Sequence, residues 1–171
     1  MLSLNLLLNY ILLIGIIHLQ ILQNQLKTLN LTNNSIEMIK EKTFQGLDNL
    51  VILYLDSNKI FEIETKSFEG LYQLEELYMM NNFIILLKAK RFNELEKLKK
   101  LHLYLCNINE IESDAFQGLN ELTELVLSFN MISVIHNGTF SGLKNLKQLD
   151  LFLNRIKEID LNGFKGLLEL N

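Results

Sequence analysis

The chain has 171 residues, of which 49% are hydrophobic, and it contains no proline, no tryptophan and a single cysteine, so no disulfide can form within it. Its net charge of −4 argues against a nucleic-acid-binding protein, because such proteins usually carry a basic face. No Gly/Ser-rich linker divides the sequence, and we therefore expect one domain.

Residues 1–25 are strongly apolar and allow three interpretations. Residues 2–22 contain no Lys, Arg, Asp or Glu, which is typical of a signal peptide or a membrane anchor, but no basic segment precedes them and no small-residue cleavage motif is clear. Asn9, Ile11 and Ile14 instead match the spacing of the repeat that follows, which favours a divergent first repeat. All three interpretations stay open, and the repeat domain is assigned to residues 26–171.

From residue 26 onward a 24-residue pattern recurs six times, and residues 50–74 show it in full as LxxLxLxxNxIxxIxxxxFxGLxxL. One column holds Asn in every repeat but one: Asn34, Asn58, Asn82, Cys106, Asn130 and Asn154. A second column holds Phe in every repeat: Phe44, Phe68, Phe92, Phe116, Phe140 and Phe164. A Gly column is broken only by Glu94. Such a period predicts a solenoid in which each repeat buries its apolar side against its neighbours.

Each repeat is expected to contain a strand and a return segment. The LxxLxL part alternates inward leucines with outward variable residues, as a strand does, and identical strands stacked along a solenoid must run parallel. In the second repeat Leu53 and Leu55 point inward, whereas Tyr54 and Asp56 point outward. The Asn that follows is expected to satisfy backbone groups at a turn. The return segment is short, which favours 3₁₀ turns or extended chain over long helices.

These columns resemble the leucine-rich repeat family, and more narrowly the 24-residue "typical" subclass found in Toll-like receptor ectodomains and Slit. The resemblance covers residues 26–170. It implies an α/β solenoid curved into a horseshoe, with a parallel β-sheet on the concave face and short 3₁₀ or irregular returns on the convex side. The sequence offers no metal cluster, phosphate loop or Ser–His–Asp constellation, so we assign no catalytic residue, metal or cofactor and expect no enzyme activity.

Two groups of residues could suggest other chemistry. Cys106 and His102 are four residues apart, but the strand alternation places His102 outward and Cys106 inward, so a buried and unreactive thiol is expected. Basic residues gather between positions 88 and 100, where an anion site is an alternative. Because Glu94 and Glu96 are interleaved with them, we expect a solvated surface instead.

Ligand specificity is expected at the outward strand positions, because the other columns are committed to the core. Exposed aromatic residues on such a face commonly mark protein interfaces, and cross-strand packing is the alternative explanation. The predicted ligand-binding residues are Tyr54, Asp56, Tyr78, Met80, His102, Tyr104, Phe129 and Phe152. Three Asn-x-Ser/Thr sequons are candidate glycosylation sites, of which Asn137 is the best placed and Asn33 and Asn30 are the others.

We therefore expect a non-catalytic module that recognises a protein or peptide on its concave face, with no nucleic-acid partner. The resemblance implies an extracellular receptor ectodomain or a secreted matrix protein at the cell surface, attached to a membrane through the N-terminus or through residues outside the chain, and a second copy is a further candidate partner. The alternative is a cytoplasmic scaffold, favoured by the absence of the cysteine-rich caps usual in extracellular members. The missing caps also lead us to expect a fragment, or ends that a partner covers.

Overall fold

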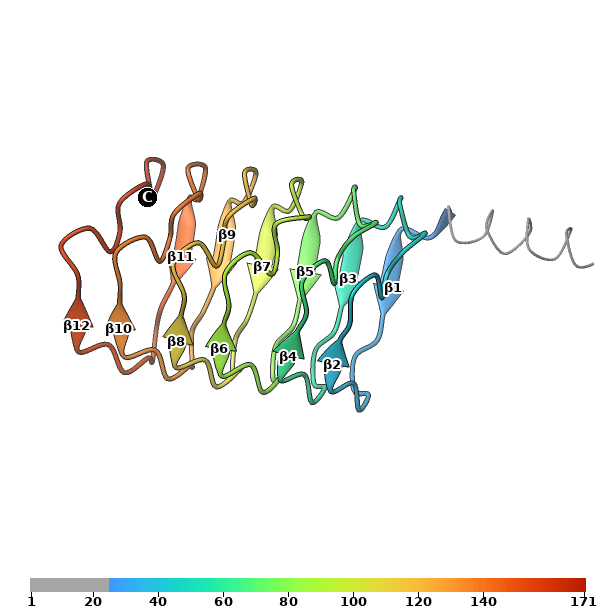
Figure 1. Ribbon diagram of the computed structural model, residues 1–171, viewed down its shortest axis with the longest axis horizontal. Helices are drawn as coiled ribbons and strands as arrows, with labels where there is room; N and C mark the ends of the chain where they lie inside the picture. The colour runs from blue at the N-terminus through green and yellow to red at the C-terminus, as the bar shows by residue number, and fades with distance from the viewer. Residues whose placement is uncertain (1–24) are drawn as a thin grey trace, which may run out of the picture.

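The computed structural model describes residues 25–171, so the predictions for residues 1–24 lie outside the described part. Each turn of the chain contributes one short strand to a six-stranded parallel sheet (Figure 1). The strands are β1 (Thr28–Asn30), β3 (Ile52–Tyr54), β5 (Glu76–Tyr78), β7 (Lys100–His102), β9 (Glu124–Val126) and β11 (Gln148–Asp150). They lie in the sheet in chain order and pair one repeat apart, as Tyr54 does with Tyr78. The predicted parallel solenoid is confirmed.

The return segments run along the opposite side of the solenoid (Figure 1). They pair in three two-stranded ladders: β2 (Met38–Ile39) with β4 (Glu62–Ile63), β6 (Leu86–Leu87) with β8 (Glu110–Ile111), and β10 (Val134–Ile135) with β12 (Glu158–Ile159). From residue 26 onward the described elements are all strands joined by turns, so the returns take the extended and irregular form that the sequence allowed, and the α/β label applies only loosely. The extended parts of the returns bond to the neighbouring repeat, as when the Phe61 amide donates to the Glu37 carbonyl, and local bonds form only isolated turns, such as that from the Leu47 amide to the Phe44 carbonyl.

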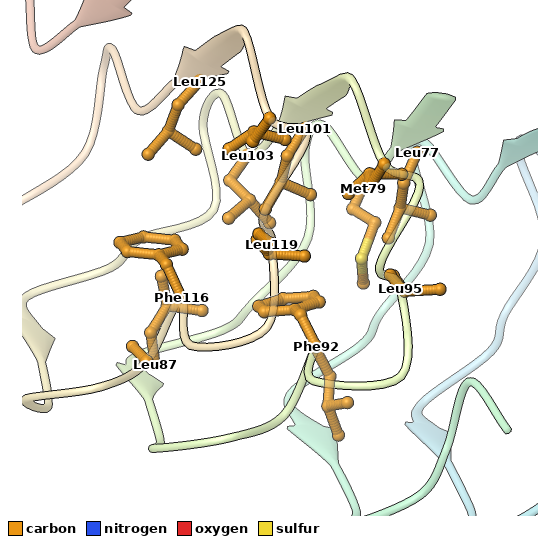
Figure 2. Packing of buried hydrophobic residues seen from close by; sticks show 14 of the residues in the cluster. Leu77, Met79, Leu87, Phe92, Leu95, Leu101, Leu103, Phe116, Leu119 and Leu125 are labelled. Carbon is orange, nitrogen blue, oxygen red and sulfur yellow. The ribbon is translucent and has the colours of Figure 1, made fainter. Parts of the chain in front are cut away.

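The core lies between the sheet and the returns. Figure 2 shows Phe92 and Phe116 projecting from return segments towards strand leucines such as Leu101, and all three side chains are fully buried. The phenylalanines of the Phe column stack in a spine of two runs of three rings, with ring centroids 6.0 Å apart for Phe44 and Phe68 and 5.6 Å apart for Phe140 and Phe164. Burial of such rings supplies much of the stability of a repeat.

The spine is interrupted at one point. Phe116 stacks on Phe140 at 6.1 Å, but among the described residues no ring contact joins Phe116 to Phe92, so the sequence-based expectation of an unbroken stack is wrong there. The interruption coincides with Glu94, which replaces the column glycine. The Asn93 backbone lies so close to Gly118 that a Cβ at Gly118 would meet it at 2.7 Å. A side chain at position 118 would therefore force the two returns apart.

An asparagine ladder closes the sheet end of each repeat. The Asn58 Nδ2 donates to the Leu31 carbonyl of the preceding repeat at 2.9 Å and to the Leu55 carbonyl of its own at 3.0 Å. Its Oδ1 accepts from the Ile36 amide at 3.0 Å. Asn82, Asn130 and Asn154 likewise satisfy backbone groups of two repeats at once, which confirms the predicted role of the column at the turn.

Replacing Phe116 by Ala should lower the free energy of unfolding by about 3–5 kcal/mol, because it leaves a cavity between repeats. Chemical denaturation measures the loss. The matched control is Phe164→Ala in the same column, where the ring is 39% exposed and the loss should be smaller. A loss below about 1 kcal/mol for Phe116→Ala would contradict the assigned repeat register.

Candidate binding face

The outward side of the six-stranded sheet, predicted to be concave, is called the strand face below. A row of three rings crosses its middle, where Tyr54, Tyr78 and His102 occupy paired positions on β3, β5 and β7. The two tyrosine rings stack with centroids 4.9 Å apart, and the His102 ring meets Tyr78 edge-on at 4.8 Å. The sheet thus brings three of the predicted residues together, and their mutual contacts restrict their rotamers before any ligand arrives.

Charged side chains beside this row pair with one another. The Lys100 Nζ lies 3.0 Å from Glu76 Oε1, and His102 Nε2 lies 2.9 Å from Glu124 Oε1. The Tyr78 hydroxyl donates to Glu76 Oε2 at 2.7 Å, which is the largest cause of the lowered pKa of Glu76. Burial, followed by the same hydrogen bond, raises the pKa of Tyr78. Sequence reasoning missed Glu76, Lys100 and Glu124, although their alternating signs recur at 24-residue spacing.

Asp56 and Met80 lie next to the ring row in the adjoining outward column. Only 9% of Asp56 is exposed, and its Oδ1 accepts a hydrogen bond from the Met80 amide at 2.8 Å. Burial raises the pKa of this carboxyl against the lowering effect of that hydrogen bond. Asp56 therefore sits on the predicted face, but one of its oxygens is already committed to the backbone of the next repeat.

A second group of rings lies towards the C-terminal end of the face. Tyr104 meets Phe129 edge-on at 5.0 Å, and Phe129 meets Phe152 at 5.7 Å. Phe129 is 38% exposed and Phe152 is 64% exposed. The eight predicted residues thus fall into a central group with paired charges and an apolar group that is open to solvent.

The basic cluster between positions 88 and 100 is neutralised in part by its neighbours. Lys88 lies 2.7 Å from Glu62 and Lys99 lies 2.9 Å from Glu75. The Lys97 Nζ donates to the Gln73 side chain at 2.8 Å. Among the described residues Lys90, Arg91 and Lys97 make no ion pair, so about half of the positive charge of this cluster stays unpaired. Within residues 25–171 no cluster of His, Cys, Asp and Glu has the arrangement of a metal site, and no helix is long and apolar enough to cross a membrane.

The three sequon asparagines lie on different surfaces. Asn137 is exposed on a return, where its Oδ1 accepts from the Asn162 amide at 3.1 Å. The hydroxyl of its sequon threonine, Thr139, is buried and has no hydrogen-bond partner among the described residues. Asn30 lies on the first strand, and Asn33 is exposed just after it.

A leucine rich repeat family model matches residues 24–84, 74–132 and 120–171, which together span nearly all of the described chain. The chain belongs to the leucine-rich repeat family. Leucine-rich repeat domains are generally non-catalytic recognition modules, and protein ligands are their general partners. A search of the curated proteins found no match.

This leucine-rich repeat chain spans only part of the length of the solved structures that it matches. TLR13 in its complex with ssRNA13 is 34% identical, with a TM-score of 0.81, and the match covers 85% of this chain and 20% of that one. Internalin C2 of Listeria monocytogenes is 25% identical, with a TM-score of 0.68, over 88% of this chain and 62% of its own. An internalin F of the same species is 21% identical, with a TM-score of 0.68, and the match covers 88% of this chain and 41% of that one. At this identity the likeness shows the fold alone.

Cys106 takes the place of an asparagine in the leucine-rich repeat ladder. Its thiol donates to the Met79 carbonyl at 3.1 Å, as an amide nitrogen does in other repeats, and burial raises its pKa to about 12. A thiol has no counterpart to the amide oxygen, which in Asn82 accepts from the Ile60 amide at 2.9 Å. The amide that would donate to an asparagine oxygen at position 106 is that of Ile84 in the preceding repeat, and it therefore has no acceptor in the ladder.

The turn around Cys106 also differs from the others. Asn107 has a φ of 63°, a left-handed conformation that the residue after the ladder position adopts in no other described repeat. The Cys106 amide also donates to Asn130 Oδ1 at 2.9 Å, an additional bond to the next repeat. The backbone has thus rearranged around the shorter side chain.

Replacing Cys106 by Asn should restore the missing acceptor and raise the free energy of unfolding by about 1–2 kcal/mol, because one or two buried hydrogen bonds are regained. Cys106→Ala is the matched control. It should lower stability, because the Met79 carbonyl loses its thiol donor. Denaturation of both variants measures the effect, and an Asn variant less stable than the Ala variant would argue against a ladder role for Cys106.

Proposed function

We propose that this leucine-rich repeat domain recognises a protein ligand on its strand face and catalyses no reaction. The observation that carries the proposal is the pre-ordered ring row, in which Tyr54 and Tyr78 stack at 4.9 Å and His102 closes on Tyr78 at 4.8 Å. Rigid amphipathic rings give a large contact area at a low entropic cost, and tyrosine is enriched among the residues that dominate interface energies. Tyr104 and the two phenylalanines beyond it extend the contact area.

The electrostatics favour a protein over a nucleic acid. Single-stranded nucleic acids bind where stacking rings accompany a positively charged groove. The rings are present here, but the cations beside them, Lys99 and Lys100, are paired with Glu75 and Glu76. The chain as a whole is acidic, with a net charge of −4. A phosphate backbone would therefore meet little free positive charge on this face.

The proposed setting is an extracellular receptor or a secreted matrix protein. The 34% identity to TLR13 and the exposed sequon asparagine Asn137 support it, while the single cysteine favours the alternative of an intracellular scaffold. Membrane attachment and glycosylation belong to the same proposal. N-terminal sequencing of the mature protein separates the two settings, because cleavage near residue 20 accompanies secretion, whereas an intracellular scaffold keeps residues 1–25.

Replacing Tyr78 by Ala should weaken binding by at least about 1 kcal/mol with little change in the unfolding midpoint, because the ring packs against its neighbours on the surface and not in the core. The probe is a set of short peptides selected on the native chain from a random display library, with affinities measured by calorimetry. Lys66→Ala, on the return side, is the control and should change neither quantity.

Two outcomes would overturn the proposal. If Tyr78→Ala lowers the midpoint but leaves peptide affinity unchanged, the ring row is structural. If single-stranded RNA binds the native chain more tightly than any selected peptide and Tyr78→Ala abolishes that binding, the strand face is a nucleic-acid site.

A further inference from the structure

A second apolar surface adjoins the strand face where the chain leaves each strand. The five-residue segments 57–61, 81–85, 105–109, 129–133 and 153–157 form this surface, called the flank below. Before the last turn, which begins near Ile159, the described chain exposes nine large hydrophobic side chains, and seven of them lie on the flank. Phe61, Phe83 and Ile85 are 52%, 50% and 56% exposed in neighbouring repeats. Clustering of this kind on one surface commonly marks an interface.

Bulky residues on the flank adopt a backbone conformation that they do not favour. Leu105, Phe129 and Leu153 have φ values of 56°, 55° and 51° at the position just before the ladder. Asn33 and Asn81 fill the same position in other repeats, and asparagine tolerates this left-handed conformation much better than leucine or phenylalanine. The fold can therefore be built with a polar residue here, so the apolar side chains indicate a contact outside the fold.

The charges of the flank all have one sign. Its five segments contain no Asp or Glu, although the chain as a whole has a net charge of −4 and the equivalent segment after β1, residues 33–37, ends in the exposed Glu37. Lys59, Arg155 and Lys157 are exposed at its two ends, and among the described residues none of them makes a side-chain ion pair. The flank is thus an apolar strip with free cations at both ends.

We propose that the protein ligand of the strand face continues over the flank and contacts it through an amphipathic segment whose apolar side chains are bordered by carboxylates. The inference rests on the function proposed above. Phe129 joins the two surfaces, because its ring contacts Tyr104 at 5.0 Å and Phe152 at 5.7 Å while its backbone belongs to the flank. The unpaired cations select an acidic border by charge complementarity.

A second copy of the chain fits this surface poorly. Any two-fold pairing of two flanks places the cationic end of one copy against a cationic end of the other, because Lys59 lies at one end and Arg155 and Lys157 lie at the other. Like charges opposed across an interface are repulsive, and the five segments hold no carboxylate to offset them, while Glu37 lies beyond the Lys59 end alone. A ligand of opposite charge avoids this cost.

The test uses two substitutions that the chain itself suggests. The double variant Leu105→Asn, Leu153→Asn installs the residue found at position 81, and it should bind the library peptides about tenfold more weakly with an unchanged or higher unfolding midpoint. The control is Tyr72→Ala, which removes a 57%-exposed ring outside the flank and should leave affinity unchanged. Peptides selected on the native chain should carry Asp or Glu beside apolar residues, and selection on Arg155→Glu, Lys157→Glu should lose that bias.

Several results would overturn the flank proposal, and they separate it from the strand-face proposal. Selected peptides without an acidic bias, or with full affinity for the double Asn variant, contradict it. If Tyr78→Ala still abolishes the binding of such peptides, the strand face is the binding surface and the flank is not part of it. If neither the double Asn variant nor Tyr78→Ala weakens peptide binding, both proposals fail. Co-sedimentation with phosphatidylserine vesicles, or a concentration-dependent dimer in solution, would assign the flank to a lipid surface or to a second copy, provided that the double Asn variant abolishes it.

Discussion

The asparagine ladder is the interaction on which the rest of this structure depends. In Asn82 the Nδ2 donates to the Leu55 and Met79 carbonyls at 3.1 and 2.9 Å, and the Oδ1 accepts from the Ile60 amide at 2.9 Å. These backbone groups are buried at a turn, where each group left unpaired would cost about 1–3 kcal/mol. One side chain therefore fixes the end of its own strand and the start of the preceding return, and the parallel register follows from its repetition.

The two surfaces follow from the same constraint. Because the strand end is fixed, alternation places Tyr54 and Tyr78 on the strand face in register one repeat apart. The turn before the ladder then holds the next residue in a left-handed conformation, which directs Leu105 and Phe129 towards solvent. The inward columns are nearly invariant between repeats while the outward columns vary, so residues that distinguish one repeat from the next lie mainly on the outside.

Much of the fold could be predicted from the sequence, because a fixed period assigns each column one environment. The columns at Asn58 and Phe68 identified the ladder and the aromatic spine before the structure was known. The break between Phe92 and Phe116 could not be foreseen, since it depends on how the return around Glu94 packs against the next repeat. The pairing of Glu76 with Lys100 was legible at 24-residue spacing, but only the register made it a contact.

Part of the flank escaped sequence reasoning for a different reason, although Phe129 was predicted to point outward. Its residues follow the strand, where the alternation of period two no longer applies, and a Leu or Phe there suggests burial. Phe61 and Phe83 are nevertheless 52% and 50% exposed, and Leu105 reaches 41% exposure from a left-handed backbone. Local dihedral angles of this kind are imposed by tertiary contacts and oppose the preference of the residue itself.

Hydrogen–deuterium exchange of four equivalent isoleucine amides tests the ladder most directly. The amides of Ile60, Ile108 and Ile132 donate to asparagine side chains at 2.9, 3.0 and 3.1 Å, whereas that of Ile84 faces the repeat in which Cys106 stands. Because one lost hydrogen bond is worth about 1 kcal/mol or more, the Ile84 amide should exchange about tenfold faster than the other three. Equal protection at all four positions would contradict the account, because it would mean that the asparagine oxygens do not hold these turns.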